Sequence, residues 1–308
     1  MSTIRARSPP LLGGTISLAE ADVGSLPLDE GAHVGFSSDV LTLEVNEHVA
    51  TLWLDREEAR NAMGSALWRD LPLAASAVSS DPSIRVVIIA AKGPHFTVGL
   101  DLKEFGGGFA EPKSSTSKAA TSAVAYKAVR AMQDSVTSIA NLNVPVIAAI
   151  HGYCIGGGID LVSACDIRLC AADAKFSIRE TKVAIVADLG TLQRLPKIVS
   201  AGHLAELAYT GKDIDASRAL SIGLVNAVHG NSAPDVLTAA HELANEIAAN
   251  SPLAVQGTKA VLGANDGRTV HEGLEFVARW NTMYLQSNDL REAMIAFMEK
   301  RPPVFNGD

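Results

Sequence analysis

Three acidic side chains in the central stretch of residues 151–190 have the chemistry to move protons. Asp160 and Asp188 stand among small or apolar neighbours, and Glu180 lies between them in the chain. A carboxylate buried in apolar surroundings must be paired, hydrogen-bonded or protonated, and such a group suits acid–base catalysis. Asp188 is the clearest candidate, with the N-cap of a helix starting near Gly190 as the alternative.

Three consecutive glycines in the same stretch predict a turn from a strand into a helix. The glycines at 156–158 follow an apolar run at 144–150 and precede a helix-like run at 160–165. Backbone N–H groups at such a helix start lack partners within the helix, and glycine lets a ligand approach them closely. The turn therefore suits a developing oxyanion or a phosphate, although a tight structural turn would have the same sequence.

A second turn of this kind is predicted at residues 92–105, directly after a continuous apolar run. Gly99 gives the backbone conformational freedom beside Leu100 and Asp101, so this strand exit can also present a free N–H. His95 could act as a base, but a single histidine next to a proline is more often structural.

Alternating strands and helices must position these turns. Strands are predicted at 41–46, 48–54, 86–91 and 167–170, and helices at 65–79, bent at Pro72, and at 119–141. This order is typical of an α/β fold with repeated crossovers. Helix-like stretches then follow at 192–199, 203–210, 216–222, 233–249, 253–264, 270–285 and 290–299, which could cover the core and mediate assembly. A mobile loop is expected at 106–118.

Composition excludes several classes of partner. The chain has 308 residues, 47% of them hydrophobic, a net charge of −8 and a pI near 5.5. The acidic balance without a Lys/Arg block argues against nucleic acid or an anionic membrane as partner. No apolar run reaches the length of a membrane span.

The cysteines and the N-terminal residues indicate the cellular compartment in which the protein is expected. The three cysteines, at 154, 165 and 170, have no CxxC or clustered-histidine spacing, so we expect buried reduced thiols and no metal site. Residues 1–38 show no sustained period and predict a loosely attached arm. They contain no long apolar segment for secretion, and several acids disfavour a transit peptide beyond the first few residues, so a targeting peptide is only a weak alternative. A reducing, cytoplasmic location is expected.

From about Leu41 to the C-terminus, the chain resembles the crotonase, or enoyl-CoA hydratase/isomerase, superfamily. HFTVGLDLKEF resembles the first oxyanion-hole segment, HGYCIGGGIDLVSACDIRLCAADAKF the second, GTLQRLPKIV the segment after the active site, and AMIAFMEKRPPVF the terminal helix. The resemblance implies an α/β fold with a crotonase-like spiral of ββα units at 39–200 and a C-terminal helical trimerisation region at 201–308. It also implies an acyl-CoA thioester substrate, no cofactor besides the CoA of that substrate, and a homotrimer or homohexamer.

The resemblance further implies roles for particular residues. The N–H groups of Leu100 and Gly157 would form the oxyanion hole, and Lys92 is a candidate contact for CoA. The expected substrate-binding positions are Phe96, Thr97, Val98 and Asp101. An apolar wall that excludes water is expected from Val183, Ile185, Val186 and Leu189.

The acids decide the reaction within the superfamily. Hydratases typically carry glutamates at the positions of Asp160 and Glu180 and a glycine at that of Asp188, so this set is similar to the Δ3,5-Δ2,4-dienoyl-CoA isomerases of β-oxidation. Moving a 3,5-diene to 2,4 removes a proton at C2 and returns one at C6, which suits two carboxyl groups. The resemblance assigns Glu180 as the base, Asp188 as the acid and Asp160 as an orienting group.

Other activities remain possible within the same fold. An enoyl-CoA hydratase or a Δ3-Δ2-enoyl-CoA isomerase is the alternative enzyme. A non-catalytic RNA-binding or scaffold member is disfavoured, because no lysine-rich helix stands out and the three acids are intact.

Overall fold

Two β-sheets form the centre of the molecule, and the computed structural model describes residues 33–106 and 117–308. The larger sheet has seven strands in the order β1-β2-β3-β4-β5-β7-β10, and the smaller has three in the order β6-β8-β9. The strands are β1 His33–Ser37, β2 Leu41–Asn46, β3 Val49–Leu54, β4 Val86–Ala91, β5 Val146–Ile150, β6 Tyr153–Ile155, β7 Ile167–Cys170, β8 Lys175–Ser177, β9 Ile214–Asp215 and β10 Ala227–Val228.

Parallel pairing in the middle of the large sheet explains its apolar strands. The strands β3, β4, β5, β7 and β10 pair in parallel, whereas β1, β2 and β3 pair antiparallel. Every residue of β4 is buried, and its alternate side chains enter two different core clusters. A strand covered on both faces needs such a continuous apolar run, which is why its sequence does not alternate.

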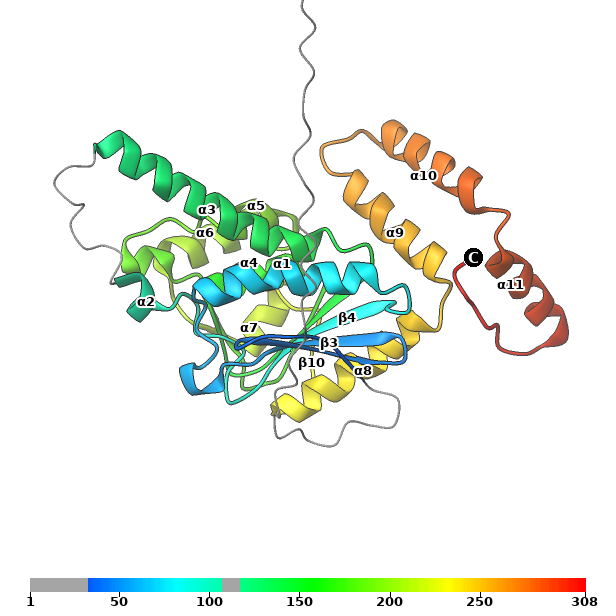
Figure 1. Ribbon diagram of the computed structural model, residues 1–308, viewed down its shortest axis with the longest axis horizontal. Helices are drawn as coiled ribbons and strands as arrows, with labels where there is room; N and C mark the ends of the chain where they lie inside the picture. The colour runs from blue at the N-terminus through cyan, green and yellow to red at the C-terminus, as the bar shows by residue number, and fades with distance from the viewer. Residues whose placement is uncertain (1–32, 107–116) are drawn as a thin grey trace, which may run out of the picture.

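Helices cover both faces of this sheet (Figure 1). The helices are α1 Ser65–Ser80, α2 Leu102–Gly106, α3 Lys118–Ala140, α4 Gly157–Ser163, α5 Thr191–Arg194, α6 Ala201–Thr210, α7 Ala216–Ser221, α8 Ala233–Ala248, α9 Pro252–Ala264, α10 Val270–Tyr284 and α11 Asn288–Glu299, with short 3-10 helices η1 Glu57–Ala59, η2 Glu180–Val183 and η3 Leu195–Lys197. One face is covered by α1 and α3, and the other by α8. Residues 236, 240, 244 and 248 of α8 recur every four positions and are buried against β4 and β5.

The predicted α/β order is observed, but the predicted domain boundaries differ from the structure. Strand β1 lies within the 1–38 arm and pairs with β2, so the described sheet begins at His33 rather than Leu41. Residues 1–32 and most of the loop predicted at 106–118 lie outside the described residues. The elements from α6 to α8, with β9 and β10, belong to the core rather than to a separate region starting at 201.

Helices α9, α10 and α11 lie to one side of the sheets and their covering helices (Figure 1). Few of their residues are buried, and those that are buried include two glycines, Gly257 and Gly273. In the part of the chain that the structure describes, no helix has the length and apolar character needed to cross a membrane.

Candidate active site

A cavity of about 250 Å³ lies where the two glycine-containing turns meet. Its walls come from the turn after β4, the start of α4, the segment 179–189, and apolar side chains of α1, α2 and α3. All three candidate acids, Asp160, Glu180 and Asp188, line this cavity together with Leu100 and Gly157. The structure therefore brings together five residues that are up to 88 positions apart in the chain.

The two turns contact one another through their backbones. Thr97 N–H donates to the Tyr153 carbonyl at 2.8 Å, and Ile155 N–H donates to the Thr97 carbonyl at 3.2 Å. Gly99 has φ +82°, and a Cβ there would lie 2.6 Å from the Ile155 carbonyl oxygen and 3.5 Å from the Gly157 nitrogen. Only glycine permits both this conformation and this approach.

Two backbone donors remain free at this junction. Within residues 33–106 and 117–308, neither the N–H of Leu100 nor that of Gly157 donates to a protein acceptor. Gly157 is the first residue of α4, so its N–H also benefits from the partial positive charge of a helix N-terminus. The pair has the chemistry of an oxyanion hole for a thioester carbonyl.

Glu180 begins η2, three residues after the end of β8, and is buried, with 8% of its surface exposed. Its Oε2 has no hydrogen-bond partner in the described part of the chain. Burial raises the pKa of Glu180 to about 7, and the nearby carboxyl groups of Asp160 and Asp188 add to this increase. A carboxyl group that titrates near neutral pH can accept a proton at the operating pH and release it again.

Asp160 lies in the first turn of α4 and is only 1% exposed. Its Oδ1 accepts the N–H of Thr191 at 2.6 Å, which ties α4 to the start of α5. Burial raises the pKa of Asp160 to about 6, whereas the bond from Thr191 and the charge of Arg194 oppose the increase. Asp160 therefore supports the segment that carries Asp188 and also lines the cavity.

Asp188 lies on the cavity in the segment between η2 and α5, and its side chain is exposed. The protein atoms around it remove part of its hydration and raise its pKa above the ordinary value for aspartate. The N-cap of α5 is Gly190, and among the residues that the structure describes no side chain caps this helix. The helix-cap alternative for Asp188 is therefore wrong, and its carboxyl group is available to the cavity.

Of the four expected substrate-binding positions, only Val98 is among the residues that line the cavity. The side chains of Phe96 and Thr97 are fully buried in the core. The Thr97 hydroxyl donates to the Asn61 carbonyl at 2.6 Å and accepts the Gly99 N–H at 3.1 Å. The side chains of Phe96 and Thr97 therefore support the turn from within the core, and contact of the substrate with the backbone at 96–98 stays a prediction.

Two charged candidates are also engaged elsewhere. Asp101 forms an ion pair of 2.8 Å with Arg56 and accepts N–H groups at the start of α2, so it shapes the turn and does not line the cavity. Lys92 pairs with Asp55 at 2.7 Å and is likewise absent from the cavity lining.

The apolar wall is partly as predicted. Val183, Ile185 and Leu189 line the cavity, but Val186 is 70% exposed and does not. The sequence analysis did not identify the rest of the wall, because its residues lie in segments without a recognisable functional motif. These residues are Trp68, Leu102, Phe105, Met132 and Ile155. Their apolar character signalled only burial.

The residues given a structural role do lie outside the cavity. The ring of His95 lies 4.5 Å from that of Tyr153, and its Nδ1 accepts the Tyr153 N–H. The three cysteines are free and buried, as expected, and burial raises the pKa of both Cys165 and Cys170 to about 12.

Comparison with known proteins agrees with this architecture. The profile of the enoyl-CoA hydratase/isomerase family matches residues 44–308. A Dictyostelium discoideum protein named Delta(3,5)-Delta(2,4)-dienoyl-CoA isomerase, mitochondrial, is 44% identical over 86% of this chain and 90% of its own. The peroxisomal protein of the same name from Arabidopsis thaliana is 40% identical over 87% and 96%.

A solved structure shows the same fold. The enoyl-CoA hydratase from Bacillus anthracis superposes with a TM-score of 0.78 at 31% identity, over 87% of this chain and 100% of its own. This match confirms the predicted crotonase-like fold. The names of the relatives contradict the predicted cytoplasmic location, since one is called mitochondrial and the other peroxisomal.

Proposed function

The chain belongs to the enoyl-CoA hydratase/isomerase family, and we propose that it converts 3,5-dienoyl-CoA into 2,4-dienoyl-CoA. The family acts on acyl-CoA thioesters, and the relatives from Dictyostelium and Arabidopsis are named for this isomerisation. The observation that carries the proposal is the third acid, since Asp188 lines the same cavity as Glu180 and the two free backbone donors. A reaction that moves a proton between two distant carbons needs two such groups.

In the first step, Glu180 takes a proton from C2 of the substrate. The electrons of the broken C–H bond form a double bond between C1 and C2, and the negative charge moves to the thioester oxygen. The N–H groups of Leu100 and Gly157 hold that oxygen as the charge develops. The unpartnered Oε2 of Glu180, in an apolar cavity, supports its assignment as the base.

In the second step, Asp188 donates a proton to C6. The double bonds shift along the chain to positions 2 and 4, and the thioester carbonyl is restored. The raised pKa of Asp188 supports this role, because a carboxylic acid must be protonated to donate. Proton exchange with solvent then resets both acids, so the reaction needs no cofactor besides the CoA of the substrate.

An ultraviolet assay tests the activity directly, because the 2,4-diene is conjugated with the thioester carbonyl and the 3,5-diene is not. The purified protein is given 3,5-dienoyl-CoA and, in parallel, 2-enoyl-CoA. We expect isomerisation to exceed hydration by a wide margin. Efficient hydration without diene isomerisation would contradict the proposal.

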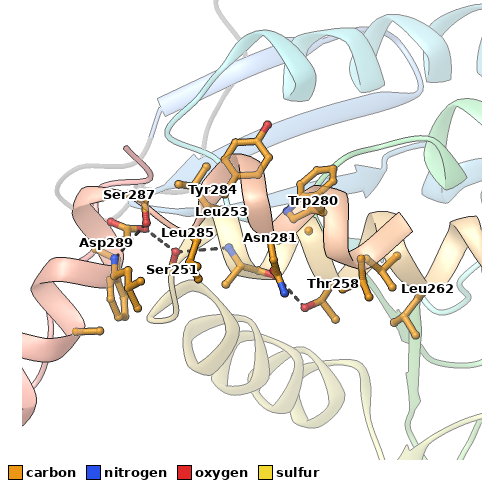
Figure 2. Close-up of a pocket in the computed structure, with 17 residues that line it drawn as sticks. Ser251, Leu253, Thr258, Leu262, Trp280, Asn281, Tyr284, Leu285, Ser287 and Asp289 are labelled. Atoms are coloured by element: carbon orange, nitrogen blue, oxygen red, sulfur yellow. Dashed lines mark hydrogen bonds between the residues drawn. The ribbon is translucent and has the colours of Figure 1, made fainter. Parts of the chain in front are cut away.

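We also propose that α9, α10 and α11 assemble the protein into a homotrimer or homohexamer. A groove of about 460 Å³ is lined by residues of these helices. Figure 2 shows Trp280 and Leu285 among its apolar lining. The hydroxyl of Ser251 donates to Asp289 at 2.6 Å and ties α11 to the start of α9. Leu262 and Leu285, which line this groove, are 69% and 62% exposed, and this exposure supports burial against further copies.

A further inference from the structure

Side chains on two elements hold the backbone of the turn that carries Asp188. From α3, Gln133 Nε2 donates to the Asp188 carbonyl at 2.6 Å. From α5, Arg194 Nη1 donates to the Leu189 carbonyl at 3.1 Å, while its Nη2 donates to the Thr137 hydroxyl of α3 at 2.9 Å. We call Gln133, Thr137 and Arg194 the helix clamp.

The chain around the turn is shaped to admit this clamp. Gly190 has φ +130°, and a Cβ there would lie 1.7 Å from Arg194 Nη1. Any larger residue would therefore push the guanidinium away from the turn. With the bond from Thr191 N–H to Asp160, three of the four residues from 188 to 191 have a backbone group bonded to a side chain, and the Gly190 carbonyl accepts the N–H groups of Gln193 and Arg194.

The clamp fixes the backbone without using the carboxyl group of Asp188. Ala187 and Leu189, on either side of Asp188, are buried and anchor the turn in the core. Residues 181–186, which precede the turn, are exposed. The two carbonyl bonds set the orientation of the peptide planes at 188 and 189. That orientation decides whether the Asp188 side chain is directed along the cavity.

We propose that Arg194 is a positioning residue that directs Asp188 to the C6 end of the substrate. The inference rests on the proposed isomerase function and adds a role that requires no contact between Arg194 and the acyl chain, since Arg194 does not line the cavity. Its bonds to Leu189 and Thr137 hold the acid end of the site, whereas Glu180 and the oxyanion donors lie on other elements.

Arg194→Met tests the proposal, with Lys197→Met as the matched control. Lys197 follows three residues later and pairs with Asp266 away from the cavity. We expect Arg194→Met to lower kcat for isomerisation about ten- to hundred-fold, because small misplacements of a catalytic group reduce rates by such factors. KM should change less than about twofold, and exchange of the C2 hydrogens with deuterated solvent should persist. Arg194→Lys should be intermediate, because one ammonium cannot reproduce the planar pair of donors.

A double-mutant comparison separates positioning from a general structural role. If Arg194 acts through Asp188, Arg194→Met should have little further effect on isomerisation in an Asp188→Asn background. The inference would be overturned if the effects of the two substitutions on kcat multiplied in the double mutant. It would also be overturned if Arg194→Met reduced isomerisation and C2 exchange equally, or if it left kcat unchanged.

A smaller change covers the case in which Arg194→Met does not fold. Thr137→Val keeps the side-chain shape and removes only one acceptor of the clamp, and we expect it to lower kcat a few-fold with C2 exchange retained. The experiments distinguish an error in the role of Arg194 from an error in the proposed function. If only the role of Arg194 is wrong, the unmodified protein isomerises dienoyl-CoA and the variants match it. If the proposed function is wrong, the unmodified protein does not isomerise dienoyl-CoA.

Discussion

At the residue scale, the site keeps two carboxyl groups in surroundings that oppose their charge. Glu180 and Asp160 are almost completely buried, and burial is the main cause of the raised pKa of each. Neither forms a direct ion pair within the described residues. Such groups destabilise the fold when they are ionised. The same unfavourable surroundings raise their pKa, which lets a buried carboxyl group act as a catalytic base near neutral pH.

The pH dependence of stability should report the burial of Glu180. Its folded-state pKa is raised from about 4.5 to about 7, so its contribution to stability is full below pH 4.5 and is lost as the pH rises through 7. Glu180→Gln removes this loss. The free energy of unfolding of the variant, relative to the unmodified protein, should therefore increase by about 3 kcal/mol between pH 4 and pH 8.

Urea unfolding at several pH values measures this difference. Glu44→Gln is the control, since Glu44 is only partly buried on β2 and is not part of the cavity lining. A difference for Glu180→Gln that stays constant with pH would show that the burial of this carboxyl group does not affect stability.

Isotope exchange should distinguish the roles of Glu180 and Asp188. Glu180→Gln should abolish both isomerisation and exchange of the C2 hydrogens with deuterated solvent, because no dienolate forms. Asp188→Asn retains the base and both oxyanion donors, so C2 exchange should survive while isomerisation falls by about two to four orders of magnitude. Proton NMR of the recovered thioester measures the exchange.

Asp39→Asn, an exposed carboxylate outside the cavity, is the control for these variants. Near-normal isomerisation by Asp188→Asn would remove Asp188 from the mechanism. Loss of C2 exchange in Asp188→Asn but not in Glu180→Gln would reverse the two roles.

Sequence patterns identified the acids but not all the side chains around them. Asp160 and Asp188 stood out because a carboxylate among apolar neighbours needs a special environment. The resemblance placed Phe96 and Thr97 near the substrate, and the structure shows that both of their side chains are fully buried beneath the turn. Which way a loop side chain points depends on packing between distant segments, which no local pattern encodes.

At the element scale, long periodic segments were predictable and very short strands were not. The predicted strands at 86–91 and 167–170 match β4 and β7, and the predicted C-terminal helices have counterparts close to their limits, except that the one at 192–199 is divided into α5 and η3. The sheet of β6, β8 and β9 was missed because its strands have two or three residues, too few to show a period. Tertiary pairing alone creates that sheet.

Gly99 tests how the turn after β4 contributes to the site. Its φ is +82°, and an added Cβ would lie only 2.6 Å from the Ile155 carbonyl oxygen, so the turn has no room for alanine. We expect Gly99→Ala to destabilise the fold by about 1–3 kcal/mol and to lower kcat, because the N–H of Leu100 would move away from that of Gly157. Thermal unfolding and the ultraviolet assay measure the two effects.

Gly202→Ala is the matched control for this substitution. Gly202 lies within α6, where an added Cβ meets no atom within 4 Å, so alanine should stabilise the helix by about 0.5–1 kcal/mol and leave kcat unchanged. Equal behaviour of the two variants would mean that the Gly99 turn does not set the geometry of the oxyanion hole.

At the scale of the whole molecule, the α/β core and the helices α9, α10 and α11 differ in how they are stabilised. The core buries both faces of its large sheet, whereas the three helices lie to the side and bury few residues (Figure 1). Apolar side chains on these helices and the turn after α10 are widely exposed: Val270, Leu274, Met283, Leu285, Met294, Phe297 and Met298. A surface of this kind is typical of an interface.

Assembly through these helices should therefore depend on their exposed apolar side chains. Phe297 on α11 is 83% exposed, and Phe297→Asp would place a charge in the proposed interface. Tyr209→Asp is the control, because Tyr209 is 81% exposed on α6 of the core. Light scattering at micromolar concentration should give a trimer or hexamer for the unmodified protein and for Tyr209→Asp, and smaller species for Phe297→Asp. A monomeric unmodified protein would contradict the assembly, and a Phe297→Asp variant of unchanged mass would place the interface elsewhere.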